Sequence, residues 1–241
     1  MTTLCIDTAT EVGTVAIARD GAVAAAVTWR SSSRHGENLF GHIDSALSEA
    51  GVARSEIALI GVDIGPGRFT SLRVGLGAAK GLALGLDVPI VGASSLRILA
   101  RSLNPADEVV RVPLMNAYRG DLFAAAYVLD GDIDEELVPP IFGSPEEVLR
   151  RVRDAVGNRS IAVCGEGVRA RAQAVETFLG VTADGRTDPV EVASATAIAA
   201  EIEHVMRRRG PDDLASLEPL YLRPSDAKLP ERVLRVPPTS S

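Results

Sequence analysis

Residues 59–86 read LIGVDIGPGRFTSLRVGLGAAKGLALGL: an apolar run, a glycine-rich turn and a long segment of small and apolar residues. The apolar run at 59–65 predicts a buried strand, and Gly65-Pro66-Gly67 closes it. Residues 70–86 then predict a long helix, which we expect to stop at Asp87 and Pro89. A buried strand that turns directly into a helix is typical of an α/β protein.

The segments on either side extend this pattern. Three short apolar segments come first, and Asp20-Gly21 between the second and third predicts an antiparallel hairpin. From Asn38 the apolar residues recur at helical spacing as far as Ala50. The first half therefore has the order βββαβαβα: strands at 3–7, 14–18 and 23–29, a helix at 38–50, the strand and helix above, a strand at 90–93 and a helix at 94–103.

A similar order restarts after a polar linker at Asn104-Pro105. We expect strands at 109–115, 122–129 and 161–164 and a turn at Asp130-Gly131. We also expect three helices: one that starts at residue 144, one that follows residues 165–167 and ends at about residue 178, and one at 190–209. The order of elements resembles two βββαβα halves of the ribonuclease-H-like fold found in the actin and sugar-kinase superfamily (ASKHA). We predict an N-terminal domain at 1–104, a degenerate C-terminal domain at 105–229 and a flexible tail at 230–241.

Composition narrows the function. The chain has 241 residues, 46% of them apolar, and a net charge of −7, which excludes global disorder and disfavours unaided binding of nucleic acid. Cys5 and Cys164 lie in apolar runs, so we expect buried thiols and neither a disulfide framework nor a metal site. The longest apolar region is interrupted by Lys80, Asp87 and Pro89, so no membrane span is expected. We expect a soluble cytoplasmic protein.

Two loops have the composition of a phosphate site. Asp7, Thr8 and Thr10 follow the first strand, and Gly65 and Gly67 form the turn before the long helix. A carboxylate, hydroxyls and a helix N-terminus can together hold a phosphate and its magnesium ion. The same residues can equally cap tight turns, and the turn lacks the Gly-Lys-Ser/Thr ending of a P-loop.

The long helix carries Gly77, Gly81 and Gly85 at intervals of four residues. Each glycine costs about 0.5–1 kcal/mol of helix stability relative to alanine, so the stripe predicts close approach of another element. That element is either the chain's own sheet or a helix of another subunit. Lys80 is then either a surface residue or a contact at the rim.

Four motifs in the first half closely resemble the bacterial TsaB (YeaZ) family: residues 6–10 (IDTAT), 35–39 (HGENL), 65–75 (GPGRFTSLRVG) and 79–83 (AKGLA). In the second half only 165–167 and the pattern from Pro219 to Arg223 match. The chain departs from the family at Arg68, Ser71, Asn116 and Tyr118.

The resemblance implies a subunit without catalytic residues. In the related catalytic proteins of the TsaD type, a His-x3-His pair binds a metal, and the matching positions here hold Ser95 and Leu99. Leucine cannot bind a metal, and a serine hydroxyl is a poor ligand for iron or zinc. We therefore expect no catalytic residue and no bound metal in this chain.

The resemblance also implies partners. The family pairs with a TsaD-like catalytic subunit and a TsaE-like ATPase to make threonylcarbamoyladenosine at position 37 of tRNA, so tRNA would be reached only through the complex. A homodimer is expected when the chain is alone. No cofactor is expected to bind tightly, although ATP or ADP with magnesium would fit the heterodimer interface. The implied partner contacts are Leu39, Ile43, Leu72, Arg73, Gly77, Lys80, Gly81 and Gly85.

Two other functions compete with this one. An ATP-dependent phosphotransferase or ATPase of the same fold would use Asp7 and the turn at 65–67, but the glycine-rich phosphate hairpin of such kinases is absent. Asn116 also stands where a second acidic phosphate motif would begin. A metallopeptidase is suggested only by an old family label, and it lacks the metal ligands.

Overall fold

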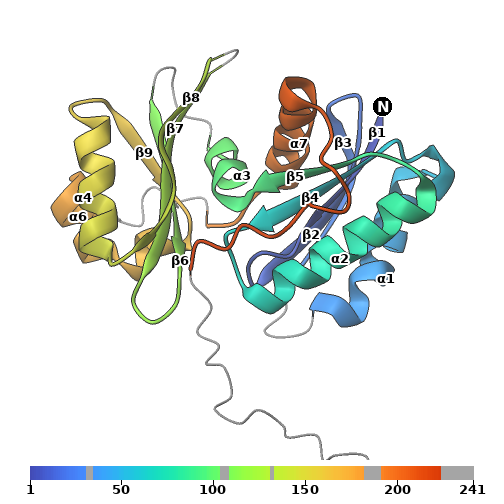
Figure 1. Ribbon diagram of the computed structural model, residues 1–241, viewed down its shortest axis with the longest axis horizontal. Helices are drawn as coiled ribbons and strands as arrows, with labels where there is room; N and C mark the ends of the chain where they lie inside the picture. Colours follow the sequence, from blue (N-terminus) through green and yellow to red (C-terminus); the bar gives the residue numbers. More distant parts are fainter. Residues whose placement is uncertain (31–34, 104–108, 131–132, 182–190, 224–241) are drawn as a thin grey trace, which may run out of the picture.

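The computed structural model describes residues 1–30, 35–103, 109–130, 133–181 and 191–223, which form two β-sheets with helices on their faces (Figure 1). The first sheet has the strand order β3-β2-β1-β4-β5. Its first three strands are antiparallel, and β4 and β5 run parallel to β1. The strands are β1 (Thr2–Asp7), β2 (Val12–Arg19), β3 (Ala22–Arg30), β4 (Leu59–Gly65) and β5 (Ile90–Ser94).

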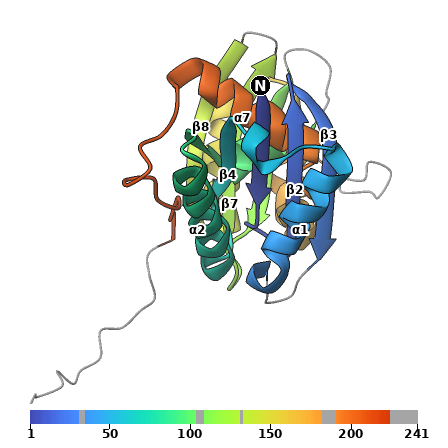
Figure 2. The ribbon, with the colours of Figure 1, turned by 90° about the vertical axis from the view of Figure 1, so that its right-hand side faces the viewer.

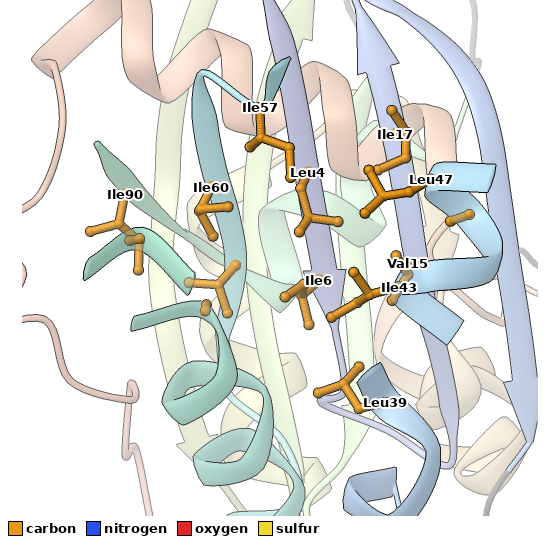
Figure 3. Packing of buried hydrophobic residues seen from close by; sticks show 14 of the residues in the cluster. Leu4, Ile6, Val15, Ile17, Leu39, Ile43, Leu47, Ile57, Ile60 and Ile90 are labelled. Atoms are coloured by element: carbon orange, nitrogen blue, oxygen red, sulfur yellow. The ribbon is translucent and has the colours of Figure 1, made fainter. Parts of the chain in front are cut away.

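Helices cover both faces of this sheet. On one face lie α1 (His35–Ala50) and α2 (Phe69–Leu86), side by side in Figure 2. Their periodic apolar residues, among them Leu39, Ile43 and Leu76, pack on Leu4 and Ile6 of the central strand (Figure 3). The short 3₁₀ helix η1 (Arg54–Glu56) leads from α1 to β4. The opposite face packs against α3 (Ser95–Arg101) and α7 (Ala195–Arg209).

The second sheet has the order β8-β7-β6-β9. Its outer face packs on α4 and α6, and its inner face packs on Leu96 and Leu99 of α3, so that α3 lies between the two sheets (Figure 1). The elements are β6 (Val110–Asn116), β7 (Leu122–Asp130), β8 (Ile133–Gly143), α4 (Pro145–Val156), β9 (Ile161–Cys164), α5 (Glu166–Ala170) and α6 (Ala172–Leu179).

This architecture confirms the prediction of two βββαβα-type halves, and both cysteines are buried and unbonded. Among the described residues no helix is long and apolar enough to cross a membrane. The predicted linker, the Gly131 end of the predicted turn and the predicted tail lie outside the described residues.

Three details of the second half differ from expectation. Strand β8 is a full element although the sequence around Pro139 and Pro140 gave no strand signal; it is an edge strand, where proline is tolerated. The helix predicted to reach 178 breaks at Arg171 into α5 and α6. Helix α7 begins at Ala195, where the Ser194 side chain caps it by accepting a hydrogen bond from the backbone N–H of Ala197.

The placement of α7 affects the predicted domain division. It comes from the second half of the chain, but its Ile198 and Ile202 pack on Cys5 and Leu59 of the first sheet. The division at residue 104 stays a prediction for the folding units. In the structure, the first sheet is covered on one face by a helix from beyond that division.

Candidate functional site

The loop after β1 packs directly on the start of α2. The hydroxyl of Thr8 donates a hydrogen bond to the carbonyl of Ser71, with 2.8 Å between the oxygens. A side chain at Gly67 would place its Cβ 2.4 Å from the carbonyl oxygen of Ala9, and one at Gly75 would place it 2.3 Å from the Thr8 hydroxyl. These two glycines therefore admit the close approach of the chain's own loop.

The remaining residues of the predicted phosphate loop are also engaged internally. The Thr10 hydroxyl exchanges hydrogen bonds with the backbone of Val12. Gly65 has φ +106°, and the carbonyl of Leu220 lies 3.3 Å from the position of its missing Cβ. The phosphate loop stays a prediction, and the contacts seen in the structure are those of tight turns.

Two buried carboxyl groups lie behind this loop. Asp7 accepts a hydrogen bond from the backbone N–H of Ala9 (2.9 Å), and Asp63 accepts from the backbone N–H of Gly65 (2.7 Å) and the hydroxyl of Ser95 (2.6 Å). Burial raises the pKa of both carboxyl groups, and the charge of Asp7 raises the pKa of Asp63 further. Asp63 is therefore the group of the pair that retains a proton to higher pH.

The space beside the pair is very small. A cavity of about 10 Å³ is lined by Asp7, Thr10, Asp63, Ser95, Leu99 and Glu166, among others. Because a single water molecule needs about this volume, the structure has no room here for a phosphate group or a nucleotide. Within the described part of the chain, no three His, Cys, Asp or Glu side chains are arranged to hold a metal ion.

The outer face of α1 and α2 has a different character. Gly77, Gly81 and Gly85 are exposed, and a Cβ at any of them would meet nothing within 4 Å. The interpretation that the stripe packs on the chain's own sheet is therefore wrong. The face of α2 that packs on the sheet carries the buried residues Leu76, Ala79 and Ala83 instead. The stripe instead lies bare on the surface of the molecule.

Three of the predicted partner contacts are not on this surface. Leu39, Ile43 and Leu72 are each at most 2% exposed and belong to the interior, so they cannot touch a partner directly. The prediction was wrong for them because apolar residues at helical spacing mark the face that meets the protein's own sheet. Lys80 and Arg73 both face the C-terminal segment, where the Lys80 ammonium donates to the carbonyl of Ala215 and the Arg73 guanidinium donates to the hydroxyl of Tyr221.

Sequence reasoning missed two exposed apolar side chains on these helices. Phe40 on α1 is 54% exposed and Leu84 on α2 is 72% exposed. The signal was available, since both residues are apolar at positions that are out of phase with the buried stripe of their helix. Helices α1 and α2 lie side by side (Figure 2), and we call their solvent-exposed surface, which carries the three glycines, Phe40 and Leu84, the α1–α2 face.

Comparison with known proteins identifies the family. The model of the family described as TsaD, tRNA N6-adenosine threonylcarbamoyltransferase, matches residues 27–216. The chain belongs to this family. Within it, the chain is similar to the tRNA threonylcarbamoyladenosine biosynthesis protein TsaB of Bacillus subtilis, with 27% identity over 95% of this chain and 96% of that protein. TsaB of Escherichia coli is 34% identical over 54% of this chain and 56% of that protein.

A solved structure has the same fold. YeaZ from Pseudomonas aeruginosa superimposes with a TM-score of 0.73 over 92% of this chain and 99% of that chain, at 23% sequence identity. At this identity the likeness shows the fold alone, and it confirms the expected TsaB-like architecture. The family match spans α1, α2 and α7, so it includes the α1–α2 face and Asp63, whereas Asp7 lies before the matched residues.

Proposed function

We propose that this TsaB-family chain is a non-catalytic subunit in the synthesis of threonylcarbamoyladenosine at position 37 of tRNA. It would bind and activate a TsaD-like catalytic subunit, together with a TsaE-like ATPase. The proposal is supported by the names of the full-length relatives, which are tRNA threonylcarbamoyladenosine biosynthesis proteins. The chain itself supplies the face through which it would act.

The observation that carries the proposal is the bare α1–α2 face. A helix with three exposed glycines in one row lets the backbone of a second helix come close, because no side chain separates them. Exposed Phe40 and Leu84 add apolar area, which is the usual content of the centre of an interface. One face of this kind can serve either a homodimer or a heterodimer, and we propose that it serves both.

The buried carboxyl pair supports a role without catalysis. Ser95, which the family resemblance places at the first position of the metal-binding pair of the catalytic relatives, donates a hydrogen bond from its hydroxyl to Asp63. Leu99, at the second position, is 4% exposed and packs between the two lobes, which are the parts of the molecule built on the first and on the second sheet. Both side chains therefore act in folding, and the space beside them does not fit a nucleotide. Any ATP or ADP with magnesium at the heterodimer interface would depend largely on groups of the partner.

The remaining parts of the proposal follow from charge. With a net charge of −7, this subunit is poorly suited to hold tRNA alone, so tRNA would be bound mainly by its partners. We propose that the modification of tRNA takes place in the cytoplasm and requires no contact with a membrane.

The first experiment is a reconstitution. Threonylcarbamoyladenosine formation on tRNA is measured with the catalytic subunit, the ATPase and the adenylate-forming enzyme of the same organism, with and without this chain. We expect modification to require the chain. Full modification in its absence would contradict the proposal and would make the phosphotransferase hypothesis the next to test, by ATP hydrolysis of the purified chain and of Asp7→Asn.

The second experiment tests the face itself. Gly81→Leu adds a bulky side chain where a partner helix would approach, and we expect at least a tenfold loss of affinity for the catalytic subunit by calorimetry, since lost close packing at an interface centre costs about 1.4 kcal/mol or more. Ala155→Leu is the matched control, because Ala155 is exposed on α4 of the other lobe. Circular dichroism should show both variants folded, and unchanged binding by Gly81→Leu would exclude this face.

A further inference from the structure

A second, larger cleft lies where the two lobes and the C-terminal segment meet. It has a volume of about 530 Å³ and is formed by the start of α2, the turn between β6 and β7, and residues 220–223. Phe69, Tyr118 and Tyr221 line it and are 50%, 45% and 43% exposed, so three large aromatic surfaces face solvent in one place. We call this the aromatic cleft.

The aromatic groups are arranged as a stack with a cation. The ring centroids of Phe69 and Tyr221 are 5.1 Å apart with 31° between the ring planes. The guanidinium carbon of Arg73 lies 3.9 Å from the Phe69 centroid, and Arg73 Nε donates to the Tyr221 hydroxyl at 2.8 Å. Within the described part of the chain these are the contacts of Arg73, so its two terminal nitrogens remain available to an anion.

The charge of the cleft is opposite to that of the molecule. Arg68, Arg73 and Arg223 line it, and none of the described residues that line it is an aspartate or a glutamate, in a chain whose net charge is −7. Arg68 lies 3.6 Å from Glu11 at the edge, and Arg223 donates to the carbonyl of Ala117, which fixes both side chains at the wall. Such a site favours an anion, although the chain as a whole has a negative net charge.

Tyr118 is held in the cleft by an unusual backbone. It has φ +60° and Arg119 has φ +53°, values that non-glycine residues adopt rarely. The turn is closed by a hydrogen bond from the Asp121 N–H to the Tyr118 carbonyl, at 3.1 Å. A tyrosine kept in this conformation and left 45% exposed is typical of a residue positioned for contact with a ligand.

We propose that the aromatic cleft binds a nucleotide, with the base against Phe69 and Tyr221 and the phosphate on the terminal nitrogens of Arg73. Flat rings recognise the face of a base, and a guanidinium recognises phosphate oxygens. The volume lies in the range of small-molecule sites. The same chemistry is offered by a free nucleotide and by one nucleotide of a single-stranded RNA. The site belongs to this chain alone, so it stands or falls independently of partner binding.

The test uses the isolated full chain and calorimetry with AMP, ADP and ATP, each with and without magnesium. Adenosine and inorganic phosphate are titrated separately, and we expect each to bind at least tenfold more weakly than AMP, because each keeps only half of the contacts. A single-stranded hexanucleotide RNA forms the last arm. Tighter binding of the RNA than of AMP identifies RNA as the source of the nucleotide, and the reverse identifies a free nucleotide.

Four variants locate the site. Phe69→Ala removes the stacking surface and Arg73→Gln removes the cation, and we expect each to weaken AMP binding about tenfold. Arg159→Gln is the matched control for the charge, because the Arg159 side chain is 49% exposed, and Ala155→Leu on α4 is the control for a change of apolar side chain away from the cleft. Absence of binding by every nucleotide and the RNA at millimolar concentration would overturn the proposal. So would binding that Phe69→Ala and Arg73→Gln leave unchanged, or inorganic phosphate binding as tightly as AMP.

Discussion

Asp7 and Asp63 place two carboxyl groups in the interior with only a water-sized space beside them. The hydrogen bonds from Ala9, Gly65 and Ser95 satisfy much of their acceptor capacity, yet two negative charges at this depth would repel each other strongly. Retaining a proton on Asp63 relieves that repulsion. The pair is thus tolerated because one member stays neutral, which ties the stability of the first lobe to pH.

Asp63→Asn should therefore stabilise the protein at alkaline pH. The folded-state pKa of Asp63 is raised well above its ordinary value of 3.8, so the folded protein holds a proton that the unfolded chain releases. The contribution of Asp63 to stability is then fully present below pH 3.8 and is lost as the pH rises through the raised pKa. Asparagine keeps the acceptor oxygen without the proton equilibrium. We expect its free energy of unfolding in urea to exceed that of the parent by about 1 kcal/mol or more at pH 8.

The measurement is a series of urea unfolding curves from pH 5 to pH 8. The difference between Asp63→Asn and the parent should grow with pH across this range. Glu135→Gln, at a half-exposed ion pair in the second lobe, is the control and should show no such trend. A difference that stays constant with pH would show that Asp63 is not protonated in the folded protein.

Helix α2 shows at the element scale how glycines of one helix lie on opposite surfaces. Gly75 is buried under the Thr8 hydroxyl, whereas Gly81 is exposed and meets nothing. Helix propensity alone would give both glycines the same cost, because glycine loses more backbone conformational entropy on folding than alanine does. Their different surroundings give them opposite responses to the same substitution.

Gly81→Ala should raise the free energy of unfolding of the isolated chain by about 0.5–1 kcal/mol. Gly75→Ala should lower it by about 1–2 kcal/mol, because the new Cβ would lie 2.3 Å from the Thr8 hydroxyl and displace its hydrogen bond to Ser71. Both are measured by thermal and urea unfolding at a concentration where the chain is monomeric. Stabilisation by Gly75→Ala would contradict this expectation and would show that the loop after β1 can shift to make room for the new Cβ at little cost in free energy.

The sequence predicted elements well where burial controls the pattern and poorly where surfaces do. Strands β1 and β4 could be predicted because each contains a short apolar run, and nearly all of their residues are buried. Strand β8 did not, because an edge strand accepts prolines and acidic residues. The candidate interface failed for Leu39, Ile43 and Leu72 for the related reason that periodic apolar residues report the core. Phe40 and Leu84 mark the exposed face because they break that period.

Contacts between segments that are far apart in sequence could not be predicted from local sequence patterns. The aromatic cleft joins Phe69, Tyr118 and Tyr221, which lie on three separate segments of the chain. The first lobe likewise takes α7 from the second half to cover its sheet. Neither juxtaposition leaves a local signal, since helical and strand periodicity describe only which face of an element is buried.

At the scale of the whole molecule, charged side chains connect the two lobes. Arg97 on α3 donates to Glu201 on α7 at 2.8 Å and to Asp134 on β8 at 2.5 Å. His204 on α7 also meets Asp134, with 2.5 Å between its Nε2 and the carboxylate oxygen. Asp134 belongs to the second sheet, whereas its two partners lie on helices that cover the first. Burial would raise the pKa of Asp134, but the hydrogen bonds and charges of Arg97 and His204 together outweigh burial and hold that pKa below its usual value.

Asp134→Asn should loosen the contact between the lobes. A carboxyl group with a lowered folded-state pKa contributes stability above pH 3.8, and that contribution is lost as the pH falls through the lowered value. The variant should therefore be less stable than the parent by about 2 kcal/mol at pH 7, since Arg97 loses a charged acceptor in a mostly buried place. The deficit should shrink below pH 4, where the parent's own carboxylate becomes protonated. Hydrogen exchange should quicken in β8 and α3, and exchange in α1 should not change. If exchange in β8 and α3 were the same in the variant as in the parent, the apolar packing of α3 would hold the lobes together without the ion pairs of Asp134.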